Sequence, residues 1–151
     1  MKESKAPPNS LTLISYSDAM TAISAAAAFA QERGVALSFV ILDPAGHLVA
    51  SARMDGAPFI TIEVARGKAF ACAATGGVPG AALAQRFRDN PMVWGNAGTL
   101  GYGAPMLPAQ GALPIRKQGI LIGAMGASGA PSDIDAEVVA QAIAAIGGDP
   151  R

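Results

Sequence analysis

Hydrophobic residues recur at every third or fourth position in several segments of the chain, the spacing of helices that bury one face. The three clearest segments cover residues 17–33, 60–75 and 132–146, and a shorter helical pattern covers residues 79–88. The sequence therefore predicts three principal helices and one short one.

Capping residues mark the ends of the first and last of these helices. Ser17 or Asp18 is the expected N-cap of the first helix, and Gly34 is its expected stop. Ser132 and Asp135 have a spacing like that of a capping box at the start of the last helix.

Two pairs of extended runs, each pair joined by a short glycine-containing turn, predict two β-hairpins. They cover residues 35–43 and 47–54, and then residues 113–116 and 120–125. Because hairpins require antiparallel pairing, we expect an α/β protein of the α+β type. The expected architecture is profilin-like, a single domain with a central antiparallel sheet of about five strands flanked by helices.

Two segments lack such patterns. Residues 1–10 hold two prolines and several charges, which predicts a flexible leader before a single domain over residues 11–151. Residues 91–114 are rich in glycine and proline and predict a long irregular segment. Loops of that length are usually functional or form interfaces.

Charge is sparse and balanced along the chain. Eleven Lys and Arg residues offset 11 Asp and Glu residues in 151 positions, while 51% of residues are hydrophobic. Without a basic field, the chain is a poor partner for nucleic acid or for an anionic membrane surface. The high apolar content favours a homo-oligomer that buries part of the surface between copies.

Cysteine content and hydropathy narrow the class of protein further. Cys72 is the single cysteine, and the ligand spacings of structural zinc sites are absent. The sequence shows no signal-peptide pattern and no apolar run of the roughly 18 residues that a membrane-spanning helix needs. We therefore expect a cytoplasmic protein without structural zinc.

His47, the sole histidine, directly follows the turn of the first predicted hairpin. A side chain there can be half exposed. It can ligate iron or accept a proton near neutral pH, or it can simply be a polar residue at the start of a strand. Both interpretations stay open from the sequence, and His47 is the best candidate for a metal bond.

A group of charged residues follows the first hairpin and suits an anionic ligand. Arg53 and Asp55 precede the second predicted helix, and Lys68 lies on it among small residues. An ammonium near the packed side of a helix needs an acceptor, for which Asp55 is the expected partner. Glu63 and Arg66 lie three positions apart, as expected of a pair on an exposed helix face.

The glycines around Tyr102 resemble a phosphate-binding loop only superficially. No third spaced glycine opens a helix and no Gly-Lys-Ser/Thr follows, so we expect no nucleotide cofactor. Trp94 and Tyr102 are suited to pack against a flat ligand, although aromatic residues more often anchor long loops to the core.

Five motifs occur in an order that resembles the GlcG/HbpS family of haem-binding proteins, which includes the C-terminal domain of PduO. They are Val-Ile-Leu-Asp-Pro-Ala-Gly-His-Leu, Arg-Met-Asp-Gly-Ala, Lys-Ala, Gly-Ala-Leu-Pro-Ile and Gly-Ala-Met-Gly-Ala-Ser-Gly, spread over residues 40–129. The resemblance covers roughly residues 10–147. It implies a compact α/β domain with an antiparallel sheet, and oligomers often built on dimers.

The resemblance also implies which positions form the site. The matching residues are His47, Arg53, Asp55 and Lys68, together with Gly111 and Pro114 of a Gly-Gly-x-Pro loop. Ala112 replaces the second glycine of that loop, which would narrow the site if the glycine allowed close approach to a ligand.

Haem binding is the first function that these residues support. Some members of the family are described as haem-degrading or haem-sensing. In such an accessory protein, His47 would ligate iron, Arg53 or Lys68 would meet the propionates, and Trp94 or Tyr102 would pack on the macrocycle.

The alternative is a small-molecule catabolic enzyme, such as an isomerase, tautomerase or lyase, acting on a carboxylated intermediate. Arg53 would then hold the carboxylate, while His47, Asp55 or Lys68 moves protons.

Overall fold

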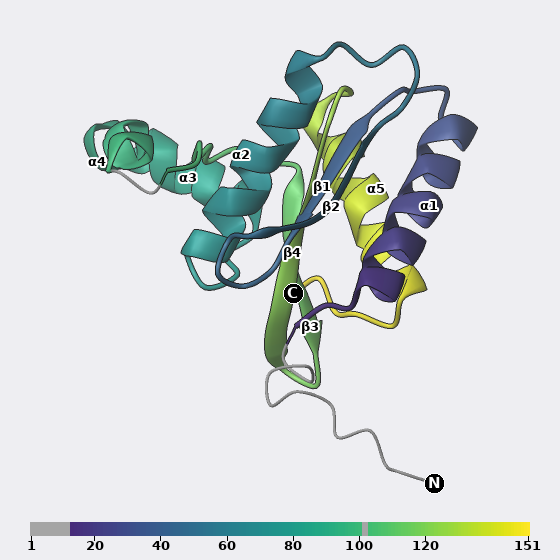
Figure 1. Cartoon of the computed structure of the whole chain (residues 1–151). Helices are drawn as coiled ribbons and strands as arrows, with labels where there is room; N and C mark the ends of the chain where they lie inside the picture. The colour runs from purple at the N-terminus through teal and green to yellow at the C-terminus, as the bar shows by residue number, and fades with distance from the viewer. Residues whose placement is uncertain (1–12, 101–102) are drawn as a thin grey trace, which may run out of the picture.

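Four strands form one antiparallel sheet with the order β2-β1-β4-β3 (Figure 1). A computed structural model describes residues 13–100 and 103–151; the predicted leader and Tyr102 lie outside them. The strands are β1 (Ser38–Leu42), β2 (Leu48–Arg53), β3 (Ala112–Lys117) and β4 (Ile120–Ser128). The α+β class is confirmed, but the sheet has four strands and not about five. Asp149 adds only an isolated bridge to Arg116 of β3.

Helices cover both faces of the sheet. Figure 1 shows α1 (Tyr16–Glu32) and α5 (Ser132–Ala145) on one face and α2 (Ile60–Ala74) on the other. The buried strand β1 shows how the sequence specifies this arrangement, because its side chains alternate between the faces. Phe39 and Ile41 join the core with α1 and α5, whereas Val40 and Leu42 pack with α2.

The predicted irregular segment, residues 91–114, is partly helical. After α3 (Gly80–Asp89), a short helix α4 (Pro91–Asn96) and a 3-10 turn η1 (Ala97–Thr99) project beside α2 (Figure 1). Asn90 caps α4 with its side chain, which accepts from the N–H of Val93. The chain then returns to β3, and the N–H of Leu107 donates to the carbonyl of Gly67 on α2.

The predicted helix starts need correction. Ser15, and not Ser17 or Asp18, caps α1 by accepting from the N–H of Asp18 at 3.0 Å. At the start of α5 no side chain forms a cap, so the capping-box interpretation of Ser132 and Asp135 is wrong. Ser132 bonds to Gln110 and Asp135 to Lys68, and Asp135 also accepts from the N–H of Ala130 just before the helix.

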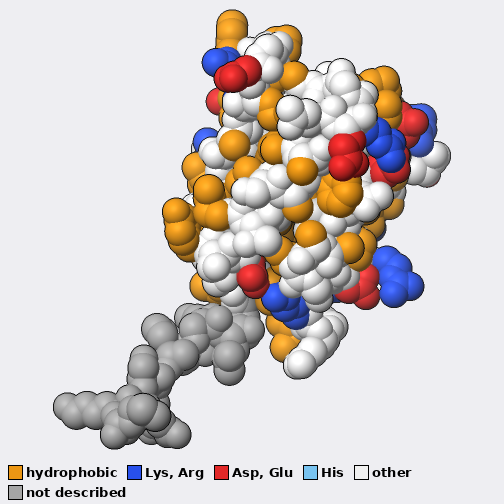
Figure 2. All heavy atoms as spheres, turned by 90° about the vertical axis from the view of Figure 1, so that its right-hand side faces the viewer, with side chains coloured by type: hydrophobic (Ala, Val, Ile, Leu, Met, Phe, Trp, Pro, Cys, Tyr) orange, Lys and Arg blue, Asp and Glu red, His pale blue; other side chains and the backbone are white. Residues whose placement is uncertain are grey.

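Hydrophobic side chains also reach the surface. Figure 2 shows them scattered between charged residues on the face that carries α1 and α5. Elsewhere Phe59, Met92 and Leu100 are 76%, 77% and 68% exposed. No helix of the described residues is long and apolar enough to cross a membrane.

Candidate functional site

His47 stands at the end of the β1–β2 turn, as the sequence predicts, with its side chain 81% exposed. Asp43 builds the turn, because its Oδ1 accepts from the N–H groups of Ala45 and His47 at 2.9 and 3.0 Å. Gly46 has a φ of +88°, and a Cβ there would lie 2.7 Å from the Phe70 ring. A glycine is therefore needed to bring the turn down onto α2.

The same aspartate also orients the imidazole. Oδ2 of Asp43 lies 3.4 Å from Nδ1 of His47. A histidine whose Nδ1 faces a carboxylate presents Nε2 outward, the arrangement common in metal-bound histidines.

A cavity of about 350 Å³ lies between this turn and α2, and we call it the His47 cavity. Its lining residues are Ala45, Gly46, His47, Leu48, Arg66, Phe70, Gly103 and Ala104.

Arg66 contributes the cationic group of the His47 cavity. Its Nε is buried and has no hydrogen-bond partner among the described residues. The predicted pair with Glu63 is not formed, since none of the ion pairs or hydrogen bonds of the described chain joins the two side chains. A buried donor without an acceptor is costly in a folded protein, which points to a partner beyond the described residues.

Arg53 and Asp55 do not line the His47 cavity. His47 immediately precedes β2, whereas Arg53 ends that strand. Arg53 and Asp55 line a broad, separate hollow of about 830 Å³ against α1. The structure therefore does not bring them together with His47 or with Lys68.

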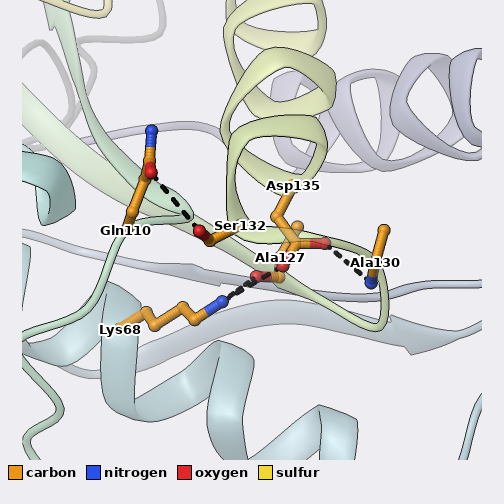
Figure 3. A network of polar contacts seen from close by, with 6 residues as sticks. All are labelled: Lys68, Gln110, Ala127, Ala130, Ser132 and Asp135. Atoms are coloured by element: carbon orange, nitrogen blue, oxygen red, sulfur yellow. Dashed lines mark hydrogen bonds and ion pairs between the residues drawn. The ribbon is translucent and has the colours of Figure 1, made fainter.

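Lys68 is buried between α2, the end of β4 and the start of α5, and its acceptor is not Asp55. Nζ donates to Oδ2 of Asp135 at 3.2 Å and to the carbonyl of Ala127 at 3.1 Å (Figure 3). The Lys68 and Asp135 side chains are only 7% and 2% exposed. Asp135 also accepts from the N–H of Ala130 at 3.1 Å. Burial raises the pKa of the Asp135 carboxyl, and the charge of Lys68 partly opposes that rise.

The Gly111 loop packs on this buried pair. Gly111 has a φ of +130°, and a Cβ there would lie 2.7 Å from Nζ of Lys68. Pro114 sits in the edge strand β3 opposite Ala124. Ala112, which replaces the second glycine of the motif, is 1% exposed and packs with Cys72, Ala73 and Ala124 in the core.

Of the two aromatic candidates, Trp94 does not line the His47 cavity. The Arg86 guanidinium lies 5.4 Å from the centre of the Trp94 ring. Tyr102 lies outside the described residues, although Gly103 and Ala104, which follow it, do line the cavity.

Other reactive groups offer little chemistry. Burial raises the pKa of the Cys72 thiol to about 12, which keeps it protonated and unreactive. Over the described ranges, no three His, Cys, Asp or Glu side chains gather closely enough to hold a metal ion.

The fold and the His47 cavity define a small α+β protein with an exposed histidine beside an arginine that has a buried nitrogen without a partner in the described chain. The sequence matches the family model described as haem degrading protein HbpS-like over residues 14–144, and the chain belongs to that family.

Solved structures agree with this assignment. The PduOC:heme complex is 26% identical with a TM-score of 0.81, over 92% of this chain and 99% of that one. HbpS is 25% identical with a TM-score of 0.78, over 95% and 96%. Klebsiella pneumoniae protein ORFY, at 23% identity and a TM-score of 0.77 over 97% of each chain, supports the fold alone. No curated protein matches the sequence.

Proposed function

We propose that this protein binds haem at the His47 cavity, with His47 as an iron ligand and Arg66 as the partner of a propionate. The observation that carries the proposal is the pairing, in one cavity, of an oriented imidazole with a buried, unsatisfied guanidinium nitrogen. The haem-related family and the haem complex of PduOC support the same ligand.

His47 is the residue that would hold the iron. Oδ2 of Asp43 faces Nδ1, which leaves Nε2 for iron, and a carboxylate beside the other nitrogen would make the imidazole a stronger donor. Bound haem would supply an iron centre whose properties depend on this ligand and on the polarity around it. Haem sensing and haem degradation both begin with such a binding step.

Arg66 takes the role that the sequence assigns to Arg53 or Lys68. A propionate is a carboxylate, and its hydrogen bonds to a guanidinium are strengthened by charge. Arg53 and Lys68 each line a different cavity, so neither is placed to meet a propionate of haem bound beside His47. Arg66 alone of the three shares a cavity with His47.

A homo-oligomer is part of the proposal, because one chain offers a small cavity for a large macrocycle. The His47 cavity is near the lower end of the roughly 300–1,000 Å³ found for ligand sites. Leu48, 51% exposed at the rim of the cavity, gives a second copy an apolar surface on which to close the open side.

Light scattering after size-exclusion chromatography tests the proposed homo-oligomer. It should give at least the mass of a dimer, and a monomer at micromolar concentration would contradict the homo-oligomer.

The experiment is a hemin titration of the purified chain followed by absorbance. We expect a saturable Soret shift that is lost or displaced in His47→Ala, because iron loses its ligand. Ser51→Ala, an exposed change on β2 outside the cavity, is the matched control and should behave like the wild type. An unchanged Soret band in His47→Ala would reject the ligand, and the absence of saturation in the wild type would reject the site.

A further inference from the structure

A second cavity, of about 380 Å³, opens between α2, α3 and the start of α5, and we call it the Lys68 cavity. Its walls are made by Lys68, Ala81, Ala84, Phe87, Arg88, Pro108, Ala109, Gln110 and Ser132. It shares no lining residue with the His47 cavity, so a ligand in the Lys68 cavity would occupy a different place from haem.

The side-chain groups of this cavity are mainly hydrogen-bond donors. An ammonium has three N–H groups, and Lys68 uses two of them on Asp135 and Ala127, so one is left. Gln110 accepts from Ser132 through Oε1 (Figure 3), and its amide N–H groups have no partner within the described ranges. The cavity therefore has donors that await an acceptor.

Charge adds to this donor character. Arg88 forms no ion pair with any described residue and donates only to the neutral Gln85. No Asp or Glu is among the lining residues, and Asp135 meets Lys68 from behind the wall. The site is therefore suited to an anion.

The remaining walls are apolar and favour an organic molecule over a bare inorganic ion. Ala81, Ala84, Phe87 and Pro108 supply surface that the carbon skeleton of a ligand can cover. The cavity volume limits that skeleton to a small one.

We propose that the Lys68 cavity binds a small organic carboxylate. Its oxygens accept from Nζ of Lys68 and the amide of Gln110, and Arg88 holds the charge at the mouth. Asp135 acts as a positioning residue, because it fixes the ammonium at the inner end of the site.

Calorimetric titration of the full chain tests this with four probes. Lactate and pyruvate are the carboxylates, lactamide is a neutral molecule of equal size, and inorganic phosphate is an anion without an apolar body. We expect saturable binding of at least one carboxylate, and binding of lactamide and phosphate at least tenfold weaker.

Variants at the cavity wall locate the binding. Ala84→Trp fills the space and should abolish it, while Arg88→Gln should weaken it about two- to fivefold, as expected of an exposed ion pair. Arg86→Gln removes the same charge from the same helix outside the cavity and is the matched control. Circular dichroism checks that each variant is folded.

Each outcome decides for or against the site. Binding that survives both Ala84→Trp and Arg88→Gln, equal binding of lactamide or phosphate, or no carboxylate binding at all would each overturn the proposal. Hemin titration of Ala84→Trp should match the wild type, since this residue does not line the His47 cavity. A failure here is therefore distinct from a failure of haem binding.

Discussion

Arg66 and Lys68 lie two positions apart on α2 and have opposite surroundings. Lys68 is buried and bonded to a carboxylate and a carbonyl, whereas Arg66 keeps a buried nitrogen without a partner in the described chain. Residues at this spacing leave a helix in different directions, so one helix serves two cavities. The comparison teaches that the buried ion pair ties Lys68 to the fold, whereas the buried nitrogen of Arg66 has no bond within the described residues that would be lost on substitution.

Removing the paired cation should have the largest effect on stability. Lys68→Met leaves Asp135 buried without its partner and should lower the free energy of unfolding by about 3–5 kcal/mol. Urea denaturation measures this loss in the free energy of unfolding. The double variant Lys68→Met/Asp135→Leu should recover most of the loss, because neither charge is then buried. A loss below about 1 kcal/mol in the single variant would show that the pair is not structural.

The glycine that packs on this lysine should be the next most sensitive position. Gly111→Ala forces a side chain into positive φ and against Nζ, and we expect a loss of about 1–3 kcal/mol in the free energy of unfolding. Gly34→Ala is the control, because Gly34 has a φ of +69° with nothing within 4 Å of its added Cβ. Equal losses in both variants would mean that contact with Lys68 adds nothing.

The pH dependence of stability should report which force dominates at Asp135. Because burial raises its folded-state pKa, this carboxyl binds its proton more tightly in the folded chain. We compare the free energy of unfolding of the wild type with that of Asp135→Asn. The difference in favour of the wild type should be greatest below the ordinary aspartate pKa of about 3.9, and it should fall as the pH rises through the raised pKa of folded Asp135. Urea denaturation between about pH 3.5 and 7 measures the slope. An opposite slope would mean that Lys68 outweighs burial.

Replacing the unpaired cation should have the smallest effect on stability. Arg66→Met should lower the free energy of unfolding by no more than about 0.5 kcal/mol, since no bond of its buried nitrogen within the described chain is lost and removal of an unsatisfied donor acts in the stabilising direction. The same urea experiment measures it. A loss above about 1 kcal/mol would indicate a partner inside the protein and remove the contrast with Lys68.

Much of the fold could be predicted from local patterns. Hydrophobic periodicity and turn glycines place both hairpins and the main helices, because these signals act over a few residues. The expected strand number is too high, and α4 is absent from the expected elements although Asn90 and Pro91 form a helix-start signal. The predicted cap of α1 is wrong because Ser15, Ser17 and Asp18 compete for that position.

The site was less predictable, because its decisive contacts join distant segments. His47 follows from its turn, but Lys68 and Asp135 are 67 positions apart, so nearby Asp55 is the acceptor that the sequence favours. Arg66 lies three positions after Glu63, a spacing that fits an ion pair on the helix surface, so the sequence does not indicate that Arg66 lines a cavity. Only the fold shows that Arg66 lines a cavity.

The most direct test of the central claim compares two arginines that line different cavities. Hemin dissociation constants are measured for Arg66→Gln and for Arg53→Gln, which remove the same charge. Loss of a charged hydrogen bond to a propionate should weaken hemin binding roughly tenfold in Arg66→Gln, with less than about a twofold change in Arg53→Gln. Equal weakening in both variants, or a larger effect of Arg53→Gln, would contradict the assignment of haem to the His47 cavity.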